Sequence, residues 1–269
     1  MSLLVWLPLD GDTHNQGIAP WNFSVSNTSM ITVDNSGKIG KCYNFNSTAA
    51  NNGIYSADNG FMGTYINNKS WSICAWVCTS STDTCVISLS YGLRIFCGNS
   101  TYVSLYNSSR TVTCTSSVAV KDGKWHHICA TYDKDSNIIT FYVDGVSTKT
   151  TSYTSGYIYA SSWTNGLFIG RDPNNSTVSD HYLYKGKMND LRIYGKALSA
   201  AEVKEISQGL ILHYKLDDRY MEDSVYLSSE ITGTAYNASN GKYSYNATSN
   251  LAKTTGFFHG KNCVKVYTL

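Results

Sequence analysis

The chain is poor in charged residues and in proline, and it has no long apolar run. Of its 269 residues, 15% are Asp, Glu, Lys or Arg and only three are proline. The net charge is +2 and no basic run occurs, so binding to nucleic acid or to an anionic membrane has little charge to draw on. No apolar stretch approaches the ~18 residues of a spanning helix. We expect no nucleic-acid partner and no membrane insertion.

Glutamate is absent from the first 200 residues, and Glu202 is the first to occur. Hydrolysis of a glycosidic bond needs two carboxylates about 5–9 Å apart. A catalytic pair would have to come from scattered aspartates, and neither a Gly-rich phosphate loop nor a Ser-His-Asp order stands out. The sequence therefore predicts a protein that is not an enzyme.

The amino terminus lacks the basic leading segment and the small-residue cleavage site of a secretory signal. We therefore expect synthesis in a reducing cytoplasm, where cysteines stay free thiols. Strand-like runs contain most of the eight cysteines, which predicts buried apolar side chains rather than disulfides: Cys74, Cys78, Cys85, Cys97, Cys114 and Cys129. His126 and His127 are adjacent in such a run, so they point to opposite faces and cannot share one metal ion.

What the chain does contain is typical of strands and tight turns, with 21 Tyr and 21 Gly among many Asn, Ser and Thr residues. Residues 71–77 are apolar on both faces, which predicts a central strand. Residues 138–143 alternate, and Asp144-Gly145 then predicts a type I′ hairpin turn. One helix of about two turns is expected after Ser199, because Ser199 and Glu202 form a capping box and Gly209 ends the segment.

Residues 210–217 resemble residues 3–10, and residues 260–266 resemble residues 40–45. We therefore divide the chain into residues 1–208, one complete domain, and residues 209–269, the start of a second β module. About 60 residues cannot complete a second sandwich of the first one's size. The sequence leaves two alternatives: a module whose remainder lies beyond residue 269, or a small β appendage on the first domain.

The order of several short segments over residues 3–207 resembles the laminin-G-like or concanavalin-A-like jelly-roll family: Gly40–Phe45, Ser72–Val77, Lys124–Asp133, Thr140–Gly145, Leu167–Gly170, Lys185–Tyr194 and Ala197–Ile206. The resemblance implies an all-β, two-sheet antiparallel sandwich whose first and last strands pair. The short carboxy-terminal helix is then expected to cover an open edge of the sandwich. The charge-poor, Asn/Ser/Thr/Tyr-rich composition is similar in style to tail or virion-surface proteins of bacteriophages.

Family members often hold one Ca²⁺ between loops, and the resemblance makes calcium the candidate cofactor, with no other cofactor expected. The candidate oxygen ligands are Asp10 and Asp12, after the first strand, and Asn189 and Asp190, in the last strand. The alternative is that these are ordinary turn and edge residues.

Sugar recognition needs an exposed aromatic surface beside short polar side chains. The candidate ligand-binding residues are Trp163 and Tyr182, which flank turns, with Tyr55 and Trp21 in two further loop-like stretches. For each of them, the alternative is a role in covering the core.

The predicted function is a non-catalytic recognition or adhesion module that binds a cell-surface glycan or host receptor as part of a phage particle or other surface assembly. It would act extracellularly on the virion surface, next to other particle proteins, and a homo-oligomer would raise its avidity. The first alternative is a structural virion protein that makes only protein contacts, and the second is a glycan-cleaving enzyme.

Overall fold

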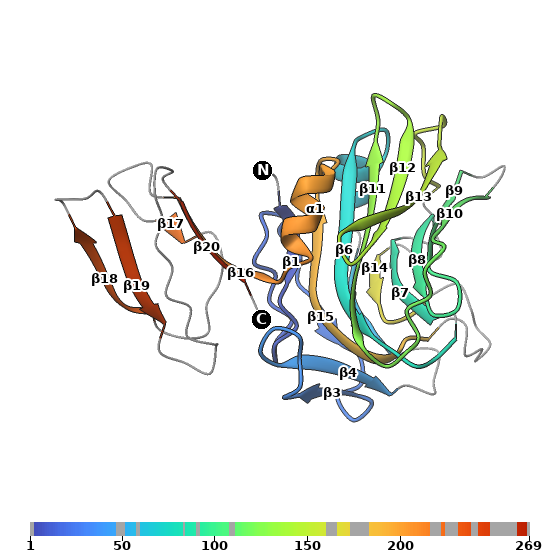
Figure 1. Ribbon diagram of the computed structural model, residues 1–269. Coiled ribbons are helices and arrows are strands. Elements are labelled where there is room, and N and C mark those ends of the chain that lie inside the picture. Colours follow the sequence, from blue (N-terminus) through green and yellow to red (C-terminus); the bar gives the residue numbers. More distant parts are fainter. Residues whose placement is uncertain are drawn as a thin grey trace. The chain divides into compact units, whose positions relative to one another are not determined.

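The computed structural model describes residues 3–46, 52–57, 60–82, 84–89, 92–107, 111–159, 166–172, 183–215, 222–223, 231–237, 242–247 and 263–267 (Figure 1). For residue 62 and for residues from 210 onward it describes the backbone alone. The chain divides into two compact units, Met1–Ser207 and Gln208–Leu269. The division falls one residue before the boundary that the sequence suggested.

The first sheet of unit 1 has eight antiparallel strands in the order β13-β12-β11-β6-β15-β4-β3, and β1 also pairs with β15 (Figure 1). The strands are β1 (Leu3–Leu7), β3 (Ile31–Asp34), β4 (Cys42–Asn46), β6 (Trp71–Cys78), β11 (Trp125–Asp133), β12 (Ile138–Val143), β13 (Val146–Ser152) and β15 (Lys185–Tyr194). The pairing of the first strand β1 with β15 confirms the expectation from the family.

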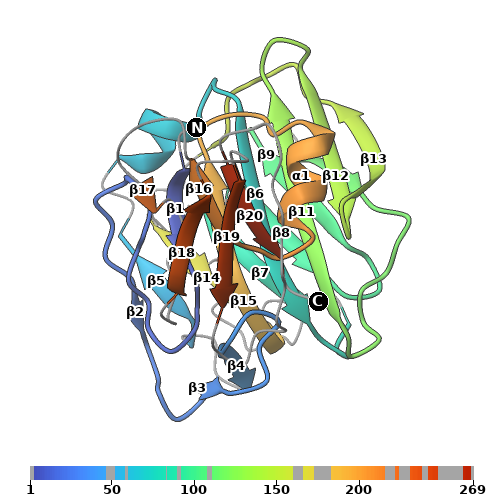
Figure 2. The ribbon, with the colours of Figure 1, turned by 60° about the vertical axis from the view of Figure 1, so that its left-hand side comes forward.

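The second sheet has seven antiparallel strands in the order β10-β9-β8-β7-β14-β5-β2 (Figure 2). The strands are β2 (Ser24–Val25), β5 (Ile54–Ser56), β7 (Thr84–Leu89), β8 (Leu93–Cys97), β9 (Tyr102–Tyr106), β10 (Thr111–Thr115) and β14 (Leu167–Ile169). One apolar cluster takes alternate side chains from both sheets, so the sheets are stacked face to face. The predicted all-β two-sheet sandwich is confirmed.

Local sequence explains the central elements. All of Trp71–Val77 is buried, and β6 lies between β11 and β15, as a strand that is apolar on both faces requires. In β12 the side chains of Ile139, Phe141 and Val143 enter the core. Asp144 and Gly145 both have positive φ, 51° and 76°, which is the geometry of the predicted type I′ turn.

The helix α1 (Ala200–Ile206) begins where the capping box predicts: Ser199 Oγ accepts from the backbone of Glu202, and the Glu202 carboxylate accepts from the backbone of Ser199. The expectation that it covers an edge is wrong. Helix α1 lies over the outer face of the first sheet (Figure 1). Its apolar cluster joins residues in and just before the helix with residues of that face: Leu198, Val203 and Ile206 with Cys74, Cys129, Tyr142 and Tyr194. The apolar side of α1 is better buried there, because that part of the face carries apolar rather than charged side chains.

A short helical segment lies outside the two sheets. A five-residue π-helical segment, η1 (Met62–Ile66), precedes β6 and was not expected from the sequence.

Unit 2 contains a three-stranded sheet in the order β17-β16-β20 and a hairpin of β18 with β19. Its strands are β16 (Leu210–Lys215), β17 (Glu222–Asp223), β18 (Ile231–Asn237), β19 (Lys242–Ala247) and β20 (Cys263–Tyr267). Among the described residues, no helix is long and apolar enough to cross a membrane.

Candidate functional site

The outer face of the seven-stranded sheet has an exposed aromatic ring at β5. Ile54 points into the core, so its neighbour Tyr55 points outward, and 43% of Tyr55 is exposed. The Tyr55 ring stacks on Phe168 of β14 with centroids 6.3 Å apart and planes inclined by 15°. The guanidinium of Arg171 lies over the same Phe168 ring, 4.6 Å from its centroid. We call Tyr55, Phe168 and Arg171 the Tyr55 platform.

The backbone around the platform fixes its geometry. Phe168 and Tyr55 are directly paired in the register of β14 with β5, which brings the rings together. A Cβ atom on Gly53 would stand 2.9 Å from the carbonyl oxygen of Ile169 and 3.0 Å from the Arg171 stem. Glycine at position 53 therefore lets the Arg171 side chain lie close to the sheet. Burial lowers the pKa of Arg171 from its usual value.

Polar side chains continue from the platform across the outer face. The strand registers place Ser88 of β7 beside Phe168, and Arg94 of β8 beside Ser88. Arg94 Nη1 lies 2.9 Å from Asp172 Oδ2, and these side chains are 13% and 0% exposed. The Ser88 hydroxyl is buried and has no hydrogen-bond partner within the described part of the chain. Ring faces, guanidinium groups, a carboxylate and a hydroxyl thus share one face, but Ser88 and Asp172 are buried. The partly exposed members are Tyr55, Arg171 and Arg94, and an aromatic ring beside polar groups is a set that sugar recognition uses.

The predicted ligand residues fall in different places. Tyr55 is the exposed member of the platform. Trp21 is 7% exposed and packs against Phe61 within the core cluster, with ring centroids 3.8 Å apart and planes tilted by 40°. It therefore supports packing and offers too little ring surface for a ligand. Trp163 and Tyr182 lie outside the described residues.

The four residues expected to hold calcium do not form a free set of oxygen ligands. Asn189 Oδ1 accepts from the backbone of Ile39, and its amide nitrogen donates to the carbonyls of Pro8 and Lys41. Asp190 Oδ1 accepts from Trp6 Nε1 and Arg192 Nε. Burial, and then the negative charge of Asp12, raise the pKa of Asp10. The calcium hypothesis stays a prediction, and Asp10 and Asp12 are the members on which it now depends.

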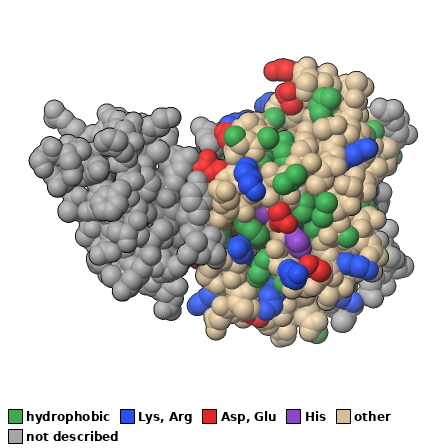
Figure 3. Space-filling view, viewed as in Figure 1, with side chains coloured by type: hydrophobic (Ala, Val, Ile, Leu, Met, Phe, Trp, Pro, Cys, Tyr) green, Lys and Arg blue, Asp and Glu red, His purple; other side chains and the backbone are tan. Residues whose placement is uncertain are grey.

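The outer face of the eight-stranded sheet carries a buried polar network instead of an open ring. The pair of Arg192 with Asp190, 2.8 Å apart, is 8% and 5% exposed, and the Arg192 guanidinium lies 5.1 Å from the Trp6 ring centroid. Burial, and then the charge of Arg192, lower the pKa of His127 to about 3, so this imidazole is neutral. On the surface seen from this side, acidic and basic side chains are interspersed (Figure 3).

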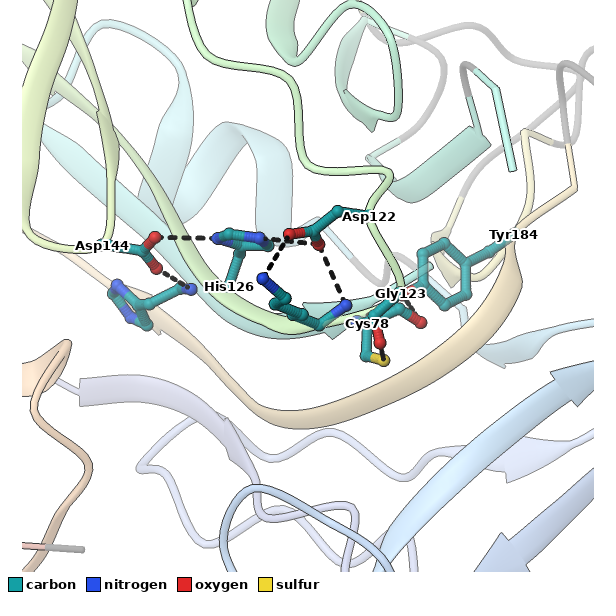
Figure 4. Close-up of polar contacts among 8 residues, drawn as sticks. Cys78, Asp122, Gly123, His126, Asp144 and Tyr184 are labelled. Carbon is teal, nitrogen blue, oxygen red and sulfur yellow. Dashed lines mark hydrogen bonds and ion pairs between the residues drawn. The ribbon is translucent and has the colours of Figure 1, made fainter. Parts of the chain in front are cut away.

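Near the start of β11, His126 lies between two carboxylates (Figure 4). Its Nδ1 is 2.8 Å from Asp144 Oδ2 and its Nε2 is 3.0 Å from Asp122 Oδ1. Asp144 Oδ1 also accepts from the backbone of His127. His127 is 1% exposed whereas the His126 side chain is 18% exposed, so these adjacent residues of β11 have different surroundings. In the described part of the chain, no group of three or more His, Cys, Asp and Glu side chains could hold a metal ion.

The first glutamate of the sequence has a structural role. Glu202 closes the capping box of α1, and its Oε1 accepts from Lys196 Nζ at 2.5 Å. It is therefore engaged at the start of the helix rather than paired with an aspartate on a sheet face.

Sequence reasoning missed Phe168, Arg171 and the Arg94–Asp172 pair. From the sequence, Phe168 was part only of the family segment Leu167–Gly170, and Arg171 follows Gly170 after β14 ends at Ile169. Nothing in the local pattern indicates that Phe168 meets Tyr55, because the two residues come together only through the pairing of β14 with β5.

Comparisons with known proteins agree with this fold. The family model of the Concanavalin A-like lectin/glucanases superfamily matches residues 48–204. Human Pentraxin-related protein PTX3 is 23% identical over 151 residues, which cover 51% of this chain. Those residues span only 38% of that relative's length.

Solved structures similar to the chain include several binding domains. The binding domain of Paraclostridial Mosquitocidal Protein 1 has a TM-score of 0.60 at 13% identity, and the match covers 99% of this chain and 70% of that structure's chain. Domain 4 of AbnA, an extracellular arabinanase from Geobacillus stearothermophilus solved with arabinotriose, has a TM-score of 0.56 at 20% identity, with coverages of 77% and 98%. The botulinum neurotoxin type G receptor binding domain has a TM-score of 0.57 at 16% identity, with coverages of 97% and 66%. At these identities the likeness establishes the fold alone.

Proposed function

Because the chain belongs to the Concanavalin A-like lectin/glucanases superfamily, we propose that residues 3–207 form a non-catalytic module that recognises a cell-surface glycan through the Tyr55 platform. The observation that supports the proposal is the Tyr55 ring, which is 43% exposed and nearly parallel to the Phe168 ring on which it stacks. A preordered ring loses little conformational entropy on binding, and its face suits the C–H groups of a sugar.

The neighbouring polar groups suit the hydroxyls of the same ligand. Arg171 lies beside the stack and Arg94 lies further along the same face, and both are partly exposed, whereas Ser88 is buried. Each neutral hydrogen bond contributes only ~0.5–1.5 kcal/mol, so one module binds weakly. A homo-oligomer, or many copies on a particle, would then supply the avidity. Trp163 and Tyr182 remain part of the proposed ligand surface, since the segments that contain them are joined in sequence to both ends of β14.

The wider setting is also a proposal. The charge-poor composition supports a place on a phage particle, on the virion surface, beside other particle proteins. A structural virion protein that makes only protein contacts remains the second candidate. Glycan cleavage is the least supported, because glutamate is absent before Glu202 and that residue caps a helix.

A glycan array with the purified chain tests the proposal. We expect Tyr55→Ala to weaken binding about tenfold, the effect of losing ~1.4 kcal/mol of stacking and burial, whereas Tyr55→Phe keeps most of it. Tyr157→Ala is the matched control, because Tyr157 is 51% exposed and is not part of the platform. Trp163→Ala and Tyr182→Ala are expected to weaken binding as well.

Three outcomes separate the candidates. A blank array together with a tight partner among the particle proteins would favour the structural role. Binding that resists Tyr55→Ala but is lost in Tyr157→Ala would place the ligand elsewhere. Shortening of a bound polysaccharide by the intact chain would contradict the non-catalytic assignment.

A further inference from the structure

Two cysteines face each other on the outer side of the eight-stranded sheet. Cys129 of β11 and Cys74 of β6 are partners in the register of these antiparallel strands. Both are free thiols and each is only 1% exposed. Side chains of directly opposed residues lie on the same side of a sheet, so the two sulfur atoms are neighbours.

The hydrogen-bond pattern shows which type of pair this is. The Asp144 amide donates to the carbonyl of His127, so the polar backbone groups of His127 point toward β12. These groups alternate sides along a strand, and those of Cys129, two residues on, point the same way. Cys74 and Cys129 are therefore a pair without hydrogen bonds between them. Cα atoms in such a pair are ~4.5 Å apart, within the ~4.4–6.8 Å that a disulfide spans.

Two cysteines on neighbouring strands of the other, seven-stranded sheet lack this arrangement. Cys85 pairs with Phe96, and Cys97 pairs with Thr84. The two are offset by one position and point to opposite faces of the sheet, so they cannot be bridged without moving the backbone. Cys85 therefore serves as an internal control: it is buried and lies near Cys97, but it does not face that cysteine across the strand pair.

Helix α1 covers the thiol pair. Val203 and Ile206 of α1, with Leu198 before it, form one apolar cluster with Cys74 and Cys129. Burial raises the pKa of the Cys129 thiol well above its usual value, and the adjacent Cys74 raises it further. A covered thiol with little thiolate reacts slowly, so an oxidant meets the pair when α1 moves away from the sheet.

We propose that Cys74 and Cys129 form an intramolecular disulfide when the folded protein meets a disulfide oxidant, and that α1 limits the rate. One cysteine thiolate attacks a sulfur of a small disulfide such as oxidised glutathione and releases one thiolate. The second cysteine then attacks the protein-bound sulfur and releases the other. Two cysteine thiols are oxidised, one small disulfide is reduced to two thiols, and two protons pass to solvent or to the released thiolates.

The modification would link β6 to β11 at the centre of the sheet. A chain folded with free thiols in a reducing compartment would gain this covalent link on reaching an oxidising one. The link closes the chain between residues 74 and 129, which constrains the unfolded state and raises the denaturant midpoint.

The test uses the full reduced chain incubated with oxidised glutathione, followed by intact mass measurement and peptide mapping without reductant. We expect a loss of two hydrogen masses, a mapped Cys74–Cys129 link, and reversal by a phosphine reductant. Cys74→Ser and Cys129→Ser are each expected to abolish that link, whereas Cys85→Ser retains it. Mapping of the wild-type chain decides the matter even if a serine variant folds poorly.

The role of α1 has its own matched pair of variants. Val203→Ala loosens the helix, and we expect the link to form about tenfold faster. Val103→Ala removes an equally buried valine from the core on β9, away from α1, and should change the rate little. Equal acceleration by both variants would show that general loosening, not α1, exposes the pair. Persistence of both thiols, or a link that involves other cysteines, would overturn the proposal.

Discussion

The outer faces of the two sheets differ in what covers them. On the eight-stranded sheet, α1 packs over Cys74 and Cys129, and the neighbouring charged side chains are paired with one another, as in Arg192 with Asp190. The seven-stranded sheet carries a buried Arg94–Asp172 pair, and on β5, next to the edge strand β2, Tyr55 is 43% exposed. One face is closed by the chain's own residues, whereas the other ends in an aromatic ring that the described residues leave accessible.

We therefore expect the first face to contribute to stability and the second to binding. A closed polar network contributes to stability, because removing one partner strands the other in a buried position. An exposed ring contributes little to stability, since most surface substitutions change it by no more than ~0.5 kcal/mol. The comparison therefore predicts variants that affect folding alone on the first face and binding alone on the second.

The largest expected effect is that of Asp190→Ala on the closed face. The change leaves the Arg192 guanidinium and the Trp6 indole without the acceptor that both use, Asp190 Oδ1. We expect unit 1 to lose about 3–5 kcal/mol of unfolding free energy in urea denaturation. Below its unfolding transition, the variant should bind the glycan like the wild type.

Two controls sharpen this test. Asp135→Ala removes an exposed carboxylate and is expected to change stability by less than ~0.5 kcal/mol. Tyr55→Ala is expected to show the converse pattern, with normal stability and weak binding. A glycan affinity that falls in Asp190→Ala while the protein stays folded would break the division between the faces.

Much of the fold was predictable because it depends on local patterns. The alternation of residues 138–143 and the Asp144-Gly145 pair specify a hairpin by themselves, and the Ser199–Glu202 capping box fixes the start of α1. The position of α1 was not predictable from the same pattern. Its apolar side indicates that it is buried, but whether an edge or a face receives it depends on which side chains the sheet presents.

The candidate site was predictable only in part, for a related reason. Tyr55 stood out as an aromatic residue near turn residues, yet Trp21 had the same local signature and is buried. The two differ because Tyr55 alternates with a core residue on a strand, whereas Trp21 packs on Phe61. Phe168 and Arg171 join the platform through long-range pairing, which no short segment encodes.

Calcium offers a second way to break the comparison, with an intermediate effect. If an ion binds at Asp10 and Asp12, in the segment that follows β1, the sheet that carries the closed face would also have a ligand. Calcium at about ten times its dissociation constant would then stabilise unit 1 by ~1.4 kcal/mol and raise its melting temperature. The increase should disappear in Asp10→Asn and on chelation. An equal response to magnesium, or no response, would reject the calcium hypothesis.

The smallest expected effect concerns His126, near the start of β11. Burial alone would lower the pKa of this imidazole, but hydrogen bonds to Asp144 and Asp122, and their charges, raise it above 6.5. Both ring nitrogens face carboxylates, so the doubly protonated ring satisfies both contacts at once. A pKa that folding raises stabilises the folded state fully below the unfolded pKa, and this stabilisation is lost as pH rises through the folded pKa.

We therefore expect the wild-type chain to lose stability relative to His126→Gln as pH rises from about 6 through the raised pKa. Urea denaturation at a series of pH values measures the difference. The carboxylates are 47% and 49% exposed, so the effect should be no more than ~0.2–1 kcal/mol and should shrink in high salt. His14→Gln, at an exposed histidine, controls for loss of an imidazole. If the wild type gained stability over the variant across this interval, the carboxylates would not be holding the proton. A matching pH dependence of glycan affinity would instead show that protonation of His126 is linked to glycan binding.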